Sequence, residues 1–526
     1  MTDSGSLSAN VIGISLGSAY SCLAILNKER QPEIIANEDG EHKMATIISF
    51  LGEEELYGNQ ALAQTVRNAR NTVGDFQPLI GLPFSDSLAA RYPANALVAK
   101  DGQVGFQVES RGAIAVFTAA ELVTQYLRYL IETAANYVGR PVDGVVLSRP
   151  AGLTPVQLEA LAAAARAAHP NLLQTVDEAP AALLAYSLGQ TATPEDPADT
   201  NALVVNVGAR ATTVAAVAVR GGLYAVRAVE TTHDFHGRAF DALIINHFAA
   251  EFKRSTKLDV KDNARAQAKL RLGCEITKRT LSSSSTAPCA VDSLLDGVDL
   301  HGTLNRSRFD IMTSKLYPAL LTTVNKSLQA AGFLPGEVDQ LVLAGGSARV
   351  PRVLSKLRTV LTAEALRVRS ELESDEVVAL GCAAQAGLLS DGRTAAVEPV
   401  VALATTEPLG LRLGEGFLTV IPRYTPLPAT RTVHVAAGAG AAYLGVSQGE
   451  VTERVDQIPS TDEDEDDEEV TTTVTVPGPI LGELVLEGVK AGAAVQVAFH
   501  IGADRVLTVT AADPASNQSG ILTITA

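Results

Sequence analysis

The sequence predicts an α/β protein followed by a smaller all-β region, and three observations favour this fold class. Two apolar hairpins, residues 11–26 and 203–219, each combine a strand, a glycine-containing turn and a second strand. Segments with strand and helix periodicity alternate through residues 1–392, as in layered α/β domains. From residue 409 onward the sequence alternates with period two and is rich in Thr and Val, which is typical of a small β-sandwich.

The two hairpins are similar enough to suggest a duplicated domain that closes on a ligand between its halves. Gly13 and Gly17 mark the first turn, and the second turn lies around Gly208. Glycine at a tight turn permits positive φ and lets backbone N–H groups approach phosphate oxygens closely. Two ordinary β-hairpins are the alternative interpretation for either one alone, but the pair favours phosphate binding.

The other elements of the first half follow from periodicity and capping signals. Thr154 is expected to cap a helix, and Pro155 suits the first turn of that helix. Strands are expected over 31–35, 46–50, 142–147 and 172–176, and helices over 61–71, 113–139, 154–168 and 179–188. A loop over 191–200 joins the two halves.

The second half is expected to be mainly helical until the sequence pattern changes to the period-two alternation of the β region. Helices are expected over 240–257, 264–281, 309–331, 350–361 and 376–389, with a strand over 341–343. The β region is expected to have strands over 417–421, 431–435, 471–476, 494–501, 506–511 and 521–525. The predicted domains are 1–392, with lobes of about 1–200 and 201–392, a linker over 393–408 and a β-sandwich over 409–526.

Composition excludes several functional classes. The chain has 526 residues with 42 Lys and Arg against 59 Asp and Glu, and this net charge of −17 argues against a chain that coats nucleic acid. Its four cysteines are dispersed, so neither a zinc site nor a disulfide framework is indicated. The N-terminus lacks secretion-signal features and no apolar run reaches about eighteen residues. We therefore expect a cytoplasmic protein without a membrane span.

Five sequence blocks in one order resemble the seventy-kilodalton heat-shock (DnaK-type) chaperone family. They are GISLGSAYSC, NTVGDFQPLIG, FDALIINHFAAEFKR, CEITKRTLSSS and LVLAGGSARVP. The resemblance runs from Val11 to the C-terminus. It implies an actin-like, two-lobed ATP-binding domain, a linker and a peptide-binding β-sandwich. Because the sequence ends at Ala526, directly after the sandwich, we expect no helical lid.

The resemblance implies that the adenosine side of an ATP site is intact. The matching helix residues recur at i, i+3, i+4 and i+7, which places them on one helical face. They are Glu275, Lys278, Arg279 and Ser282, and the matching loop residues are Gly345, Gly346, Ser347 and Arg349, with Asp375 at the adenine rim. Further implied ATP contacts are Gly17, Ser18, Ala19, Tyr20, Gly208, Ala209, Arg210 and Gly237. A solvated helix face and a surface turn are the alternative interpretation of these residues.

The phosphate side departs from the family pattern. Ser15 and Asn206 stand where the family has Asp, Gln77 replaces the catalytic Lys, and Thr213 replaces a further Asp, whereas the water-positioning Glu is retained as Glu178. Losing the positioned Lys and the metal-organising Asp should reduce turnover by orders of magnitude. We therefore expect no metal ligands, Mg²⁺ weakly held or absent, and a chain that binds ATP but is not an enzyme. Arg210 is a candidate to bind a phosphate without Mg²⁺.

These departures resemble an atypical, ribosome-associated branch of the family, the Ssz type. That branch implies a heterodimer with the J-protein zuotin, contact with the ribosome through that partner, and support of a conventional heat-shock chaperone on nascent chains. It implies no direct contact with nucleic acid or membrane. The alternatives are an active chaperone ATPase with a peptide-binding β-domain and a nucleotide-independent scaffold. Residues 462–469 are consecutively acidic, and we expect a solvated loop there that either aids solubility or attracts a basic partner.

Overall fold

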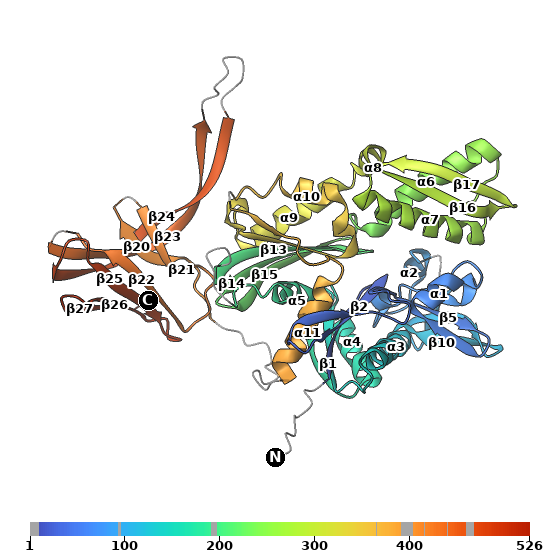
Figure 1. Cartoon of the computed structure of the whole chain (residues 1–526), viewed down its shortest axis with the longest axis horizontal. Helices are drawn as coiled ribbons and strands as arrows, with labels where there is room; N and C mark the ends of the chain where they lie inside the picture. Colours follow the sequence, from blue (N-terminus) through green and yellow to red (C-terminus); the bar gives the residue numbers. More distant parts are fainter. Residues whose placement is uncertain are drawn as a thin grey trace.

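The computed structural model describes residues 10–92, 96–190, 197–363, 365–390, 403–414, 416–438, 440–458 and 468–525. Two lobes face each other across a cleft, and a β-sandwich lies beside the second lobe (Figure 1). We use "first lobe" for the described residues of 10–190 and 377–390. "Second lobe" denotes those of 197–376, and "sandwich" denotes those of 403–525.

Each lobe is built on a sheet path of the same five-strand topology. In the first lobe the order is β12 (Leu172–Asp177), β11 (Gly144–Arg149), β1 (Val11–Leu16), β2 (Tyr20–Leu26) and β3 (Pro32–Ile35). In the second it is β19 (Arg367–Arg369), β18 (Gln340–Ala344), β13 (Asp199–Val207), β14 (Thr212–Arg220) and β15 (Leu223–Thr232). Strands β1 and β13 occupy equivalent places, because each is antiparallel to its hairpin partner and parallel to β11 or β18. The predicted similarity of the two hairpins is confirmed.

The helices between the two sheets come very close to the strands and to each other. An added Cβ on Gly13 would lie 2.2 Å from the backbone nitrogen of Ala383, and one on Gly381 would lie 1.8 Å from the carbonyl oxygen of Ala181. These glycines let α11 (Val377–Ser390) pack on β1 and on α5 (Glu178–Ala185). The expectation that Gly13 belongs to the turn is therefore wrong, because Gly13 lies within β1 and serves helix packing.

The other elements of the first lobe are shorter and more numerous than expected. The segment 113–139, predicted as one helix, is a strand followed by a helix, because Thr118 and Glu121 form a capping box that starts the helix at Ala119. These elements are β4 (Met44–Ala45), β5 (Ile47–Leu51), β6 (Glu54–Tyr57), α1 (Gly58–Gln64), η1 (Ala69–Asn71), β7 (Thr72–Gly74), η2 (Gln77–Leu79), α2 (Asp86–Ala90), β8 (Leu97–Lys100), β9 (Gln103–Ser110), β10 (Ala113–Thr118), α3 (Ala119–Val138) and α4 (Pro155–Ala168).

The second lobe has the expected helices, except that the segment 309–331 contains parts of two. Pro318 lies in the first turn of the second helix, where its fixed φ starts a helix and its missing N–H costs nothing. The elements are α6 (Gly237–Thr256), α7 (Ala264–Ser283), β16 (Thr286–Leu295), β17 (Val298–Asn305), α8 (Arg306–Thr313), α9 (Tyr317–Ala331), η3 (Pro335–Glu337), η4 (Gly346–Arg349) and α10 (Pro351–Leu357). No helix in the described part of the chain is both long and apolar enough to cross a membrane.

The sandwich consists of two four-stranded sheets that enclose an apolar core of residues such as Leu411, Val446 and Phe499. One sheet contains β21 (Gly416–Ile421), β20 (Leu409–Leu413), β23 (Gly440–Ile458) and β24 (Glu468–Val489). The other contains β22 (Ala429–Ala436), β25 (Ala494–Ile501), β26 (Leu507–Asp513) and β27 (Gln518–Ile524). Strands β23 and β24 extend beyond the sandwich as a long ribbon (Figure 1).

Two sequence-based expectations fall largely outside the described residues. Most of the predicted linker 393–408 is not described, and neither are residues 462–467 of the acidic run. The predicted boundaries near residues 200 and 392 stay predictions.

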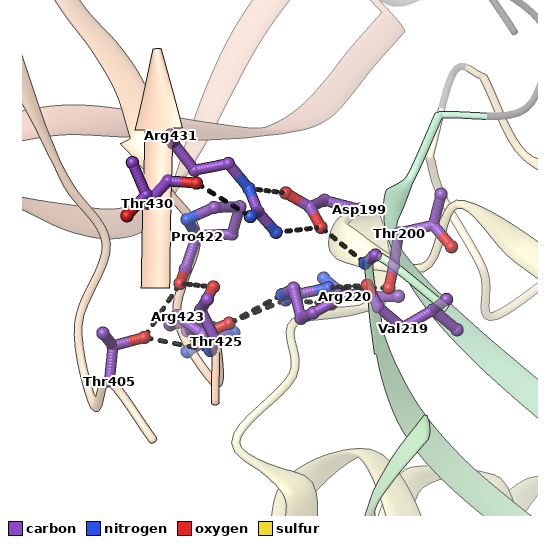
Figure 2. Close-up of polar contacts among 12 residues, drawn as sticks. Asp199, Thr200, Val219, Arg220, Thr405, Pro422, Arg423, Thr425, Thr430 and Arg431 are labelled. Atoms are coloured by element: carbon purple, nitrogen blue, oxygen red, sulfur yellow. Dashed lines mark hydrogen bonds and ion pairs between the residues drawn. The ribbon is translucent and has the colours of Figure 1, made fainter. Parts of the chain in front are cut away.

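The sandwich contacts the second lobe through a polar junction centred on Arg220 (Figure 2). Arg220 is 3% exposed, and its Nε and Nη2 donate to the backbone oxygen of Arg423 at 3.0 and 2.7 Å. Its Nη1 donates to carbonyl oxygens within the second lobe. At the edge of the junction Arg431 pairs with Asp199 at 3.1 Å, and the Tyr424 hydroxyl donates to a carbonyl of α9 at 2.9 Å. Burial lowers the pKa of Arg220 to about 10.

Candidate functional site

A cleft of about 1800 Å³ lies between the two lobes. Its floor contains the turns of the two equivalent hairpins, and α7 and the loop after β18 contribute to its walls. Every site residue predicted from the sequence lines this one cleft. They are Ser15, Gly17, Ser18, Ala19, Tyr20, Gln77, Glu178, Asn206, Gly208, Ala209, Arg210, Thr213, Gly237, Glu275, Lys278, Arg279, Ser282, Gly345, Gly346, Ser347, Arg349 and Asp375. Their individual roles stay predictions.

At the end predicted to hold the nucleoside, the first hairpin touches α7. The Tyr20 hydroxyl donates to Glu275 Oε1 at 2.9 Å, and Arg279 donates to the same oxygen at 2.7 Å. The guanidinium of Arg279 also lies 4.7 Å from the centre of the Tyr20 ring. Burial, and then the charge of Glu275, raises the pKa of Tyr20. These contacts join the two lobes and leave one face of α7 lining the cleft.

The loop after β18 holds Arg349 against acidic partners. Arg349 pairs with Asp375 at 2.5 Å and also with Glu373, and Lys43 of the first lobe pairs with Asp375 as well. Burial opposes ionisation of Asp375, but Lys43 and then Arg349 lower its pKa below the ordinary value. Gly345 has φ of 81°, and an added Cβ there would lie 2.4 Å from Asn206 Oδ1. A glycine is therefore required at the start of this loop.

The phosphate end is dominated by one buried carboxylate and two arginines. Asp75 accepts from Arg210 Nε at 2.7 Å and Nη2 at 2.5 Å, and it pairs with Arg238 Nη2 at 2.8 Å. Asp75 belongs to the first lobe and both arginines to the second, so these bonds cross the cleft. The Arg210 guanidinium also lies 4.4 Å from the centre of the Tyr92 ring.

The floor of the cleft holds the retained glutamate. Asn206 Nδ2 donates to Glu178 Oε2 at 2.9 Å, and Thr213 is paired with Asn206 across the second hairpin. Burial raises the pKa of Glu178 to about 7. A carboxyl group with a pKa near the working pH fits a general base or acid.

Sequence reasoning missed three residues that the structure brings to the phosphate end, namely Asp75, Arg238 and Arg271. Asp75 lies two residues before the predicted Gln77, and Arg238 directly follows the predicted Gly237. The available signal was Arg210 itself, because a partly buried guanidinium in a turn favours an acidic partner.

Two lobes of the same fold around a cleft, followed by a β-sandwich, define an actin-like nucleotide-binding protein with an appended β-domain. The family model described as Hsp70 protein matches residues 11–526. The chain therefore belongs to the Hsp70 family, which binds nucleotide together with Mg²⁺.

Three relatives show how far the similarity extends. A heat shock protein 70 homolog of Schizosaccharomyces pombe is 32% identical over 533 residues, covering 95% of this chain and 93% of the relative. The ribosome-associated complex subunit SSZ1 of Saccharomyces cerevisiae is 32% identical over 533 residues, covering 96% and 98%. A ribosome-associated molecular chaperone of Saccharomyces cerevisiae is 32% identical over 523 residues, covering 98% and 81%.

Family membership corrects one prediction. The substitutions at Ser15 and Gln77 led us to expect a chain that is not an enzyme. Members of the Hsp70 family are typically ATPases, and the relatives include conventional heat shock proteins of Dictyostelium discoideum and Neurospora crassa. That prediction is therefore wrong. The prediction gave weight to the replaced groups but not to Glu178. The structure places Glu178 on the cleft floor, where its pKa is about 7.

Proposed function

We propose that this chain is an ATP-binding chaperone subunit of a ribosome-associated complex. It forms a heterodimer with a zuotin-like J-protein in the cytoplasm, reaches the ribosome through that partner, and supports a conventional heat-shock chaperone on nascent chains. The observation that carries the proposal is the similarity to SSZ1 along nearly all of both chains. Similarity to the second Saccharomyces cerevisiae relative, which is also named as ribosome-associated, supports the same location.

The cleft is proposed to hold ATP with the nucleoside against α7 and the phosphates above the two hairpin turns. The cleft-facing side of α7 presents Lys278 and Ser282, with Lys278 held by Asp241 at 2.7 Å. The phosphate end presents Arg210 and the floor presents Glu178. We assign Glu178 as the group that accepts a proton from the attacking water, because no other carboxylate of the described cleft combines this depth with a pKa near 7.

The partner is proposed to bind on the sandwich. Strand β24 is an edge strand of its sheet, so an extended segment can pair with it as an additional strand. Val476, Ile480 and Val485 of β24 are 36–51% exposed, so this strand offers three aliphatic side chains to a partner. A J-protein segment with apolar side chains facing these three positions would cover them.

Affinity purification from cytosol at moderate salt, followed by ribosome sedimentation, tests the proposal. We expect a J-protein in amounts near those of the tagged chain, and ribosomes in the same fraction. Ile480→Asp should reduce recovery of the J-protein at least fivefold, whereas Ile311→Asp, at an isoleucine of α8 that is no less exposed, should not. Recovery of neither J-protein nor ribosomes would contradict the proposal.

A conventional chaperone ATPase with a peptide-binding sandwich is the second candidate. The conventional relatives and the position of Glu178 favour it. It predicts saturable binding of extended apolar peptides by the isolated chain, and release of those peptides on addition of ATP. The purification separates the two candidates, because this one predicts client peptides without a stoichiometric J-protein.

A further inference from the structure

The residues at the phosphate end do not fit the Mg²⁺ site that the family implies. Mg²⁺ requires near-octahedral oxygen ligands, and in nucleotide sites these are usually substrate phosphates and waters together with one or two protein carboxylates. Asn206 presents a neutral amide whose nitrogen is bonded to Glu178, and Ser15 presents a hydroxyl. Asp75 is already engaged by two arginines. Among the described residues, no three His, Cys, Asp or Glu side chains are grouped to hold a metal ion.

The same end of the cleft carries an excess of positive charge. Arg210 and Arg238 share the single carboxylate of Asp75. Arg271 of α7 also lines the cleft, and it has no hydrogen bond or ion pair with any described residue. Burial, and then repulsion by Arg238, lowers the pKa of Arg271. Asp241 also lies near Arg238 and Arg271, but it pairs with Lys278. The three guanidinium groups and Asp75 therefore leave two positive charges without a paired carboxylate, which equals the charge of one Mg²⁺.

A second, independent observation points to an anionic or acceptor ligand here. Gln77, two residues after Asp75, is 3% exposed and lines the cleft. Its Nε2 is a buried donor with no hydrogen-bond partner among the described residues. Buried polar groups are nearly always paired, so a donor without a partner at a cavity wall indicates a ligand that supplies the acceptor. Guanidinium groups bind phosphate oxygens in bidentate geometry, which suits them to this role.

We propose that Arg210, Arg238 and Arg271 bind the polyphosphate of ATP without a divalent metal, and that the phosphates displace Asp75 from Arg210 and Arg238. Asp75 then serves as an internal anion that keeps the two arginines oriented across the cleft while no nucleotide is bound. Gln77 donates its free N–H to a phosphate oxygen. This inference rests on nucleotide binding by the cleft and does not depend on the ribosomal role.

Calorimetric titration of the full chain with ATP, in EDTA and in Mg²⁺, tests the inference. We expect the Kd of ATP to differ less than tenfold between the two buffers. In EDTA, Arg271→Ala and Arg210→Ala should each raise the Kd of ATP at least tenfold and leave the Kd of adenosine unchanged. Asp75→Asn should lower the Kd of ATP at least threefold, because the carboxylate that competes with the phosphates is removed.

Arg265→Ala is the matched control, because Arg265 lies on the same helix as Arg271 but does not line the cleft. Arg210→Lys, which keeps the charge, covers the case in which Arg210→Ala does not fold. It should retain ATP binding more strongly than the alanine variant. A Kd that rises tenfold or more in EDTA, arginine variants with unchanged ATP affinity, or weaker binding by Asp75→Asn would each overturn the inference. Normal ATP binding with failed recovery of a J-protein would overturn only the proposed function.

Discussion

Two junctions hold this molecule together, and both are built on arginine. Between the lobes, Arg210 and Arg238 pair with the side-chain carboxylate of Asp75 on the wall of a large cleft. Between the second lobe and the sandwich, Arg220 donates mainly to backbone carbonyl oxygens, including that of Arg423 (Figure 2). The difference lies in what the guanidinium groups bind and in whether that partner can be replaced.

A carboxylate at a cavity wall can be exchanged for another anion, because its arginines stay in contact with an anionic group throughout. Backbone carbonyls are part of the chain and cannot be exchanged, and each one left buried without a donor costs about 1–3 kcal/mol. The comparison therefore indicates that the junction between the lobes responds to ligand, whereas the junction with the sandwich is a fixed structural contact.

Replacing Arg220 should break the fixed junction and have the largest effect. Arg220→Met keeps much of the length of the side chain but removes every donor, so several buried carbonyls lose their partner. We expect the free energy of unfolding to fall by about 3–5 kcal/mol, because two or more buried carbonyls are left without a donor at about 1–3 kcal/mol each. Thermal denaturation measures the loss, and small-angle scattering should show a larger radius of gyration as the sandwich detaches.

Arg254→Met is the control, because Arg254 is an exposed residue of α6, a helix that contributes no contact to this junction among the described residues. A loss of stability no larger than that of the control would show that the junction is replaceable after all, and would remove the contrast between the two junctions.

The second prediction concerns Glu178, which joins the lobes through Asn206. Its pKa rises from 4.5 to about 7 on folding, so the folded chain holds a proton that the unfolded chain has lost between these values. Stability should therefore fall as pH rises from about 4.5 to about 7, and the full cost should be present above pH 7. Glu178→Gln removes the charge and should raise stability at pH 8 by about 3 kcal/mol.

Urea denaturation between pH 5 and pH 8 tests this, with Glu159→Gln on the exposed surface of α4 as the control. The glutamine variant should show a flatter pH profile than both the parent chain and the control. Parallel profiles for all three would contradict the pKa shift. The same variant should lower ATP turnover, because glutamine cannot accept the proton of the attacking water.

Local signals predicted much of the fold. Thr154 was expected to start a helix, and it caps α4 through a bond from the backbone of Gln157. The strand over 494–501 is found with the predicted bounds. Errors arose where a local pattern had two solutions. The apolar residues of 113–118 fit a helix or a strand equally well. In the structure they form a strand because they pair with β9.

The sequence predicted residues that line the cleft, but it did not predict their contacts with one another. Matching blocks identified residues that all line the cleft, because hairpins and helices place their side chains in a way that local sequence encodes. The pairing of Arg210 with Asp75 joins positions 135 residues apart in different lobes. No periodicity or spacing encodes such a contact, since it depends on how far the lobes close.

The third prediction tests the nucleoside end of the lobe junction. Tyr20→Phe removes the hydroxyl that donates to Glu275 but keeps the ring over which Arg279 lies. We expect a loss of about 1 kcal/mol without nucleotide, the usual net value of one hydrogen bond. Differential scanning calorimetry measures it, with Tyr137→Phe at a half-exposed position of α3 as control. Added ATP should reduce the difference, and an equal difference with and without ATP would count against ligand-responsive contacts between the lobes.

The smallest effect is expected at the rim of the fixed junction, where Asp199 and Arg431 are 20% and 33% exposed. Asp199→Asn keeps an oxygen that can accept from the Gly221 N–H and removes only the charge. Partly exposed ion pairs contribute about 0.2–1 kcal/mol and are screened by salt. The variant should therefore lose at most about 1 kcal/mol at low salt, converge with the parent chain at high salt, and keep the sandwich docked. A loss comparable to that of Arg220→Met would mean that charge, and not the donation of N–H groups to backbone carbonyls, fixes this junction.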